Sequence, residues 1–225
     1  MCVCLRFRAA ILLLALSSVR IVFASPQGVE PAKEPSPVRL VFLGDSLTAG
    51  YGVGELEAFP HLLERALSER GHEVQVVNAG VSGDTSAGGL SRLAWSLRQG
   101  PDILVVELGG NDGLRGLPLE MTENNLRQIV SAAEEAGSRI LLLGMLMPPN
   151  YGPDYTQGFA AIFPRLSEEL GIALVPFLLE GVGGQPELNQ PDGIHPTAAG
   201  HLILANNVYP YLERMILDLG PPSQR

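Results

Sequence analysis

The sequence predicts an α/β protein in which a parallel sheet of about five strands is covered by helices on both faces. Short runs rich in Val, Ile and Leu alternate along the chain with longer segments whose apolar residues recur at helical spacing. This alternation is typical of strand–helix–strand crossovers, which place helices on both faces of a parallel sheet. The chain has 225 residues, of which 46% are hydrophobic and 17% charged, so it can bury the core of one domain.

Five strands are expected, each bounded by Gly, Pro or polar residues: 38–43, 74–77, 102–108, 139–143 and 172–175. The helices cover residues 59–69, about 85–98, 122–136, 159–170 and 197–217. Their apolar faces include Leu62, Leu63, Ala66, Leu67, Leu90, Leu93, Ala94, Leu97, Leu126, Ile129, Val130, Ala133, Leu202, Ala205, Val208 and Leu212. Residues 147–158, with three prolines and two glycines, predict a long irregular loop.

The first 24 residues have the pattern of a signal peptide. Arg6 and Arg8 precede an apolar run, and small residues before residue 25 resemble a cleavage site. The run is short for a bilayer span and Arg20 follows it, so an uncleaved N-terminal anchor is the alternative. We therefore expect a periplasmic or secreted protein with a signal peptide at 1–24, a flexible linker at 25–37, one domain at 38–219 and a tail at 220–225.

Charge and cysteine content exclude several functions. After residue 24 the chain carries 12 Lys and Arg against 24 Asp and Glu, a formal net charge of −12. Such an acidic surface disfavours nucleic acid and anionic lipid head groups as partners, and no stable membrane span is expected in the mature form. Cys2 and Cys4 both precede the predicted cleavage site, so cysteine catalysis and thiolate metal sites are excluded from the mature chain.

Four polar loops leave or lie near the carboxyl ends of the predicted strands, where open α/β sheets bind ligands. Their sequences are Gly44-Asp45-Ser46-Leu47, Ser82-Gly83-Asp84-Thr85, Gly109-Gly110-Asn111-Asp112 and Asp192-Gly193-Ile194-His195-Pro196. Taken alone, Asp45 or Ser46 has the simpler interpretation of a helix cap, because Ser and Asp are frequent caps. The carboxyl ends of parallel strands meet at one edge of a sheet, so we expect the four loops to converge.

The convergent residue types are those that a serine hydrolase needs. Ser46 is the candidate nucleophile, His195 the base and Asp192 the carboxylate that orients the imidazole. The oxyanion of a tetrahedral intermediate would receive hydrogen bonds from Ser46 N, Gly83 N and the Asn111 side chain. This chemistry requires no metal and no organic cofactor.

These four segments resemble the four sequence blocks of the GDSL or SGNH hydrolases, in the same order. The stretches 106–116 and 149–152 resemble the bacterial periplasmic arylesterases, lysophospholipases and acyl-CoA thioesterases within that superfamily. The resemblance covers about residues 39–217. It implies a flavodoxin-like three-layer α/β/α fold, a triad of Ser46, Asp192 and His195, and an oxyanion hole of Ser46, Gly83 and Asn111.

The acyl pocket is expected to lie beside the Asn111 loop. Leu114, Leu117 and Pro118 follow Asn111 and would close over an acyl chain, and the loop containing Tyr151 would form the opposite wall. The expected partner is a small acyl ester or thioester, and the expected state is a monomer. An ordinary exposed turn is the alternative for residues 113–119.

Other classes of protein and of site fit the sequence less well. The spacing of Gly50, Gly52 and Gly54 does not match a dinucleotide-binding fingerprint, and no G-x-S-x-G elbow surrounds Ser46. A metal site of Asp192, His195 and His201 is disfavoured because His201 would point away from the loop. An O-acetylesterase for carbohydrates, an acyltransferase and a non-catalytic binding module remain as alternatives. Trp95 is expected to be a packing residue and not a platform for substrate, and His61 and His72 are expected at the surface.

Overall fold

The computed structural model describes Met1 and residues 36–220, so the expected signal peptide, linker and tail fall almost entirely outside the described residues. The domain is built on one sheet of five parallel strands in the order β2-β1-β3-β4-β5. The strands are β1 Val38–Gly44, β2 Val74–Gly80, β3 Ile103–Glu107, β4 Arg139–Leu143 and β5 Ala173–Val175. The predicted five-stranded parallel sheet is therefore confirmed.

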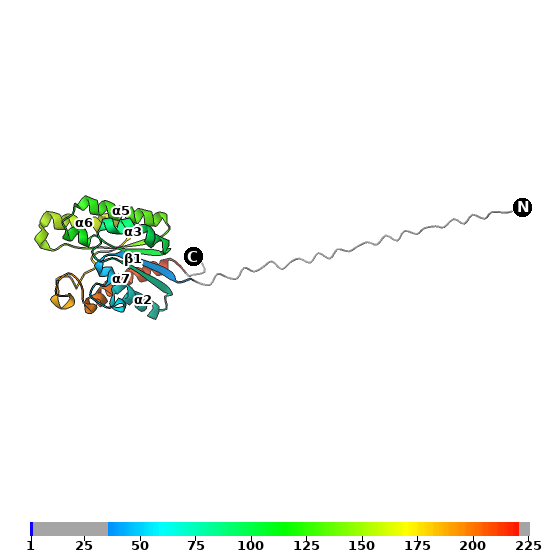
Figure 1. The fold of residues 1–225 in the computed structure, drawn as a ribbon, viewed down its shortest axis with the longest axis horizontal. Coiled ribbons are helices and arrows are strands. Elements are labelled where there is room, and N and C mark those ends of the chain that lie inside the picture. The colour runs from blue at the N-terminus through cyan, green and yellow to red at the C-terminus, as the bar shows by residue number, and fades with distance from the viewer. Residues whose placement is uncertain (2–35, 221–225) are drawn as a thin grey trace. The chain divides into compact units, whose positions relative to one another are not determined.

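Helices cover both faces of the sheet and complete three layers (Figure 1). On one face lie α3 Ser86–Arg98, α5 Leu119–Glu135 and α6 Pro153–Leu170, and on the other α2 Phe59–Glu69 and α7 Ala198–Asp218. Short helices follow two strands, α1 Ser46–Ala49 after β1 and α4 Gly110–Leu114 after β3. Single 3₁₀ turns form at η1 Glu55–Glu57, η2 Pro149–Tyr151 and η3 Pro186–Leu188.

The central strands β1 and β3 are almost continuously apolar because helices bury both of their faces. Six of the seven residues of β1 and all five of β3 are buried, and Glu107 is the one charged side chain among these buried positions. The loops that carry Ser46 and Asn111 leave the carboxyl ends of these strands, so the most buried part of the sheet supports both residues.

Two helices begin earlier than the sequence predicts. The segment expected to be irregular, residues 147–158, contains η2, and α6 then begins at Pro153 rather than Phe159. Proline is favoured in the first turn of a helix, where its missing N–H is not needed, so Pro153 starts this helix instead of preventing it. For the same reason α5 begins at Leu119, directly after Pro118, and not at Thr122.

The interior face of α3 differs from the expected one. Ala94 is exposed, so the prediction that it packs inward is wrong, and Trp95 is 45% exposed. Small side chains face the sheet instead, namely Ser86, Gly89 and Ser96. A methyl group at Gly89 would lie 2.2 Å from Leu108 Cδ1, which shows how closely this helix approaches the core.

Corrections of the same kind apply elsewhere. Leu202 of α7 is 49% exposed, and its neighbours His201 and Leu204 face the interior in its place. His61 and His72, expected at the surface, are half-buried, and His72 Nε2 lies 3.5 Å from a carboxylate oxygen of Glu213. Within the part of the chain that the structure describes, no helix is both long and apolar enough to cross a membrane.

Candidate active site

Ser46 lies at the carboxyl end of β1, in the middle of the sheet, as the first residue of α1. Asp45 caps this helix, because its Oδ1 accepts a hydrogen bond of 3.0 Å from Leu47 N. The turn is tight at Gly44, where a methyl group would lie 1.9 Å from Thr48 Oγ1, so a side chain is excluded there. Asp45 therefore has the capping role of the simpler interpretation, and Ser46 is left free to face the neighbouring loops.

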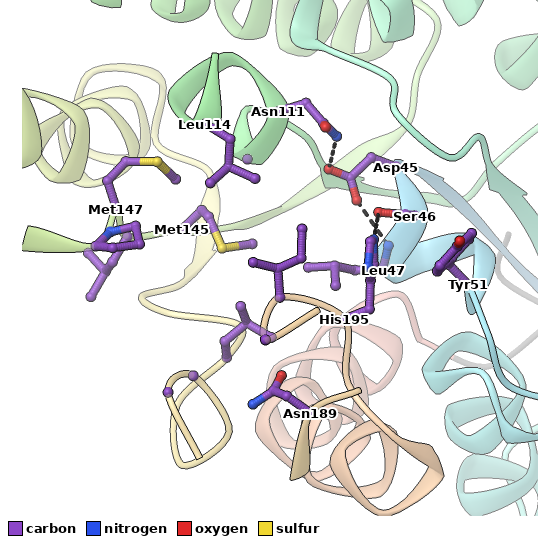
Figure 2. A pocket seen from close by; sticks show the side chains of 18 of the residues that line it. Asp45, Ser46, Leu47, Tyr51, Asn111, Leu114, Met145, Met147, Asn189 and His195 are labelled. Carbon is purple, nitrogen blue, oxygen red and sulfur yellow. Dashed lines mark hydrogen bonds between the residues drawn. The ribbon is translucent and has the colours of Figure 1, made fainter. Parts of the chain in front are cut away.

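His195 approaches Ser46 from the loop before α7. Its Nε2 lies 2.9 Å from Ser46 Oγ (Figure 2). Its Nδ1 lies 2.8 Å from Asp192 Oδ2. The other carboxylate oxygen of Asp192 accepts hydrogen bonds of 3.0 Å from the backbone N–H groups of Ile194 and His195. One short turn therefore holds the carboxylate against the ring, as the D-G-I-H spacing predicts.

The hydrogen bonds to Asp192 set its charge state. The His195 side chain, followed by the backbone N–H groups of His195 and Ile194, lowers the pKa of Asp192 to about 2, although its side chain is 40% exposed. The carboxylate is ionised at neutral pH and accepts a hydrogen bond from His195 Nδ1–H. In the neutral imidazole, Nε2 then carries no proton and is directed at Ser46. This is the tautomer that a general base needs.

Gly83 and Asn111 lie on the other side of Ser46. Gly83 is exposed with φ at +83°, a conformation that favours glycine. Asn111 lies in α4, and its Nδ2 donates a hydrogen bond of 2.9 Å to Asp45 Oδ2 (Figure 2). The same nitrogen donates one of 2.9 Å to Asp84 O. The side-chain amide is thus aimed at the turn that carries Ser46, but in the free protein both of its hydrogens have acceptors.

The position of α4 is fixed by a buried carboxylate and an unusual glycine. Asp112 is fully buried, and it accepts hydrogen bonds from Ser86 N at 2.7 Å and Ser86 Oγ at 2.5 Å. Gly109, just before α4, has φ at +107°, so the awkward backbone position falls on Gly109 and Asn111 itself is helical. These two features hold Asn111 where it meets Asp45.

A cavity of about 600 Å³ opens beside Ser46 and His195 (Figure 2). Its lining includes Ser82, Gly83 and Asn111 together with Ser46 and His195. The remaining wall is mostly apolar and comes from α1, α4 and three loops: Leu47, Leu114, Met145, Leu146, Met147, Pro148, Pro149, Phe177, Leu179 and Ile194. A reacting polar group at one end and a long apolar wall beyond it suit an acyl ester.

The structure places one of the four predicted pocket residues in the wall of the cavity. Leu114 lines the cavity, whereas Leu117, Pro118 and Tyr151 are not among its lining residues. Tyr151 instead donates a hydrogen bond of 2.9 Å from its hydroxyl to Leu114 O, and Tyr155 does the same to Leu117 O at 2.8 Å. The 147–158 segment therefore braces the Leu114 loop with its tyrosines and contributes Met147, Pro148 and Pro149 to the wall.

Sequence reasoning missed three residues that assemble the site. Gln190 bonds the turn after Ser46 to the His195 loop, and Tyr51 places its ring 4.6 Å from the His195 ring, centroid to centroid. Arg92 of α3 bonds Asp84 Oδ2 at 2.6 Å, Ala79 O at 2.6 Å and Gly44 O at 2.8 Å, and so ties the ends of β1 and β2 together. No local pattern in the sequence points to Gln190 or Arg92.

No group of three or more His, Cys, Asp or Glu side chains in the described residues could hold a metal ion. His201 is buried against α2, where its Nδ1 accepts a hydrogen bond of 3.3 Å from Phe59 N. Burial lowers the pKa of His201 to about 4, so the ring is neutral. Its role is to cap α2, away from Asp192 and His195.

The fold has three layers, and a hydrogen-bonded series of serine, histidine and aspartate lies at the carboxyl edge of its parallel sheet. This combination is typical of serine hydrolases. The model of the GDSL-like lipase/acylhydrolase family matches residues 42–203. The chain belongs to this family, and it is a serine hydrolase that acts on ester bonds.

Similar proteins agree with this assignment. Esterase TesA of Pseudomonas aeruginosa is 43% identical over 178 residues, which are 79% of this chain and 89% of TesA. Thioesterase 1/protease 1/lysophospholipase L1 of Escherichia coli is 42% identical over 178 residues, 79% of this chain and 84% of the relative. The psychrotrophic esterase EstA from a Pseudoalteromonas species, in a structure inhibited by monoethylphosphonate, has a TM-score of 0.76 at 32% identity and covers 80% of this chain and 99% of its own.

Proposed function

We propose that this protein hydrolyses carboxylic esters and thioesters through an acyl-enzyme on Ser46, with His195 as general base and Asp192 as its orienting carboxylate. One observation carries the proposal: Ser46 Oγ, His195 Nε2, His195 Nδ1 and Asp192 Oδ2 form a continuous hydrogen-bonded chain with links of 2.9 and 2.8 Å. This chain ends at a cavity with an apolar wall. The geometry matches what nucleophilic acyl transfer requires.

The reaction has two half-reactions. His195 Nε2 accepts the Ser46 proton as Oγ bonds to the acyl carbon, and the imidazolium then gives that proton to the departing alcohol or thiol as its bond to carbon breaks. Water enters, loses a proton to His195 and attacks the acyl-enzyme. The proton returns to Ser46 Oγ as the carboxylic acid leaves. Asp192, ionised throughout, stabilises the imidazolium formed in both halves.

The oxyanion is proposed to bind Ser46 N, Gly83 N and Asn111 Nδ2. The amide of Asn111 already has two acceptors, so the oxyanion must replace one of them or share a hydrogen. Asp84 O is a neutral carbonyl and Asp45 a carboxylate, and hydrogen bonds to ionised acceptors are about twice as strong. The Asp84 bond is therefore the one that yields to the oxyanion, while the Asp45 bond keeps the amide in place.

The cavity favours a substrate with an apolar acyl chain. Its wall beyond Ser46 carries methionine, leucine, proline and phenylalanine side chains, which offer a sugar few hydrogen-bond partners. Relatives named arylesterase and thioesterase 1/protease 1/lysophospholipase L1 support aryl esters, acyl thioesters and lysophospholipids as candidate classes. A carbohydrate O-acetylesterase is the less favoured candidate on this ground.

We also propose that the protein is exported and acts as a monomer in the periplasm or outside the cell. The basic and apolar pattern of residues 1–24 supports export. A single chain supplies Ser46, His195, Asp192 and Asn111, which supports a monomeric functional unit. N-terminal sequencing of the exported protein, expected to begin at Ser25, and sedimentation of the purified protein test the two statements.

The test of function is covalent labelling by a fluorophosphonate, followed by hydrolysis of p-nitrophenyl esters of increasing acyl length. Wild type is expected to be labelled at Ser46 and to release p-nitrophenol. Ser46→Ala should abolish labelling, and His195→Ala should lower both labelling and hydrolysis by several orders of magnitude. Ser91→Ala, at an exposed serine of α3, is the matched control. A wild-type protein that is neither labelled nor active on any ester would favour the binding-module alternative.

A further inference from the structure

The carboxyl group of Glu107 lies directly behind the turn that carries Ser46. Glu107 ends β3, beside Gly44 of β1, and is 1% exposed. Its Oε2 accepts hydrogen bonds from Asp45 N at 3.1 Å and from Thr48 Oγ1 at 2.9 Å. These donors flank Ser46 on both sides in the sequence. The carboxyl group therefore holds both ends of the turn, and the absence of a side chain at Gly44 makes room for it.

Asp45 extends this arrangement to the opposite side of the site. It is 3% exposed, and its carboxylate accepts from Leu47 N at 3.0 Å and from Asn111 Nδ2 at 2.9 Å. Glu107 bonds the backbone of Asp45, and the side chain of Asp45 bonds Asn111. A chain of hydrogen bonds thus runs from Glu107 through Asp45 to Asn111.

Two adjacent buried carboxyl groups cannot both be ionised without a cation between them. Arg92, on α3 against β1, is occupied by Asp84 Oδ2, Ala79 O and Gly44 O. Strands β1 and β4 present apolar residues beside Glu107, so Asp45 and, beyond it, His195 are the titratable groups that act on this pair. Oε1 of Glu107 is buried and receives no hydrogen bond within residues 36–220, which leaves it free to carry a proton.

The pair has a preferred location for that proton. Burial, followed by the charge of Asp45, raises the pKa of Glu107 well above its ordinary value. Burial also raises the pKa of Asp45, but hydrogen bonds from Leu47, Glu107 and Asn111 and the nearby His195 oppose that rise. The pKa of Glu107 is therefore raised more than that of Asp45, and Glu107 is the group that keeps the proton.

We propose that Glu107 is a positioning residue of the active site, which as a neutral carboxylic acid fixes the turn carrying Ser46 and, through Asp45, the amide of Asn111. The proposal rests on the proposed function, in which Ser46 is the nucleophile and Asn111 an oxyanion donor. Glu107 does not touch the substrate. Its contribution is to hold the Ser46 nucleophile and the Asn111 donor at a fixed separation, and a misplacement of about 1 Å can cost about 10² in rate.

The protonation state is tested by equilibrium unfolding of wild type and Glu107→Gln between pH 5 and pH 8. In the unfolded chain Glu107 releases its proton above about pH 4.3, whereas in the folded protein it keeps the proton until its raised pKa is reached. The folded state then binds one more proton, so wild type loses stability relative to Glu107→Gln as pH rises. The ratio of their unfolding constants should grow by about tenfold per pH unit in this window.

The exposed Glu135→Gln variant is the matched control for the loss of one carboxyl group, and its ratio to wild type should stay flat over the same range. A flat ratio for Glu107→Gln would mean that Glu107 is ionised in the folded protein, and it would overturn the proposal. This measurement requires no catalysis, so it stands even if the proposed esterase activity fails.

The positioning role is tested by kcat and KM on one p-nitrophenyl ester. Glu107→Leu removes the acceptor for Asp45 N and Thr48 Oγ1 and should lower kcat by about 10–100-fold with KM changed much less. Glu107→Gln keeps an oxygen acceptor and should recover most of that loss. Thr48→Val removes one of the two donors, so its kcat should lie between those of Glu107→Leu and Glu107→Gln. This variant replaces Glu107→Leu as the test if the leucine variant does not fold.

The outcomes separate this inference from the proposed function. If wild type is labelled at Ser46 by a fluorophosphonate but folded Glu107→Leu and Thr48→Val keep its kcat, the positioning role is wrong and the esterase proposal stands. If Glu107→Gln loses as much kcat as Glu107→Leu, a negative charge and not a neutral acceptor is needed there, which also overturns the inference. If wild type is never labelled, it is the proposed function that fails.

Discussion

Gln190 Nε2 donates a hydrogen bond of 2.7 Å to the backbone oxygen of Tyr51, and the same nitrogen donates to Pro196 O at 3.0 Å. The backbone N–H of Gln190 donates to His195 O at 2.7 Å. One residue therefore joins the turn after Ser46 to the segment on either side of the imidazole. The distance between Ser46 and His195 is held by groups that belong to neither side chain.

We expect Gln190→Glu to lower kcat by about tenfold or more without unfolding the protein. The variant places a carboxylate oxygen against two carbonyl oxygens that now receive N–H groups, and the repulsion separates the Ser46 turn from the His195 loop. The measurement is kcat on a p-nitrophenyl ester beside the thermal unfolding midpoint. Gln128→Glu, at an exposed position of α5, controls for the added charge. Equal kcat in the two variants would show that Gln190 does not set this alignment.

Replacement of Asn111 by alanine should reduce kcat by about 10²–10³, the usual cost of one oxyanion donor. The variant loses the amide that faces the Ser46 turn, while the buried Asp112 continues to anchor α4. The rate of fluorophosphonate labelling should fall in parallel, because that reaction develops a similar charged oxygen. Asn124→Ala, on the exposed face of α5, should leave both rates unchanged. A loss confined to KM would assign Asn111 to substrate binding instead.

The stability of the protein should fall between about pH 4 and pH 2 through Asp192. The pKa of Asp192 in the folded protein is about 2, below its ordinary value of 3.8. The contribution of Asp192 to the free energy of unfolding is therefore complete above pH 3.8 and is lost as pH falls through the folded-state pKa. Wild type should therefore lose stability relative to Asp192→Asn on acidification, as measured by urea unfolding. Because Asp192 is 40% exposed, the difference should shrink in high salt. A salt-independent or absent difference would contradict this account.

A tryptophan at Leu179 should shift the acyl-length preference toward short esters. Leu179 lines the apolar part of the cavity, so a larger side chain removes volume where a long acyl chain would lie. The measurement is kcat/KM on p-nitrophenyl acetate, butyrate, octanoate and decanoate. Leu202→Trp, at an exposed position of α7, should preserve the wild-type profile. An unchanged profile in Leu179→Trp would place the acyl chain elsewhere.

Sequence reasoning predicted the layers of the fold well because local signals determined them. Alternating strand and helix periods gave five parallel strands, and β4 matches the expected residues 139–143. Convergence of the strand ends followed from topology alone, and the structure does bring Ser46, Asn111, Asp192 and His195 to one edge. Prolines misled at Pro118 and Pro153, where they begin helices and do not extend loops.

Contacts between distant segments were the part that the sequence did not reveal. Gln190, Arg92 and Glu107 bond Tyr51, Gly44 and Asp45, which lie 139, 48 and 62 positions away in the chain, and neither spacing nor composition marks such a pair. Tyr151 was predicted to line the cavity because the long irregular segment 147–158 was interpreted as a binding loop, but its hydroxyl is bonded to Leu114 O. The choice between the two roles depends on tertiary packing.

Two of the segments that line the apolar wall are separate from those that carry the proposed reacting groups. Residues 145–149 follow β4 and residues 177–184 precede η3, and neither stretch supplies Ser46, His195, Asp192 or Asn111. Insertions, deletions or substitutions in these two loops can therefore alter which acyl group is accepted while the bond-breaking machinery is inherited intact. In evolution or in the laboratory, substrate range in this scaffold can diversify one loop at a time.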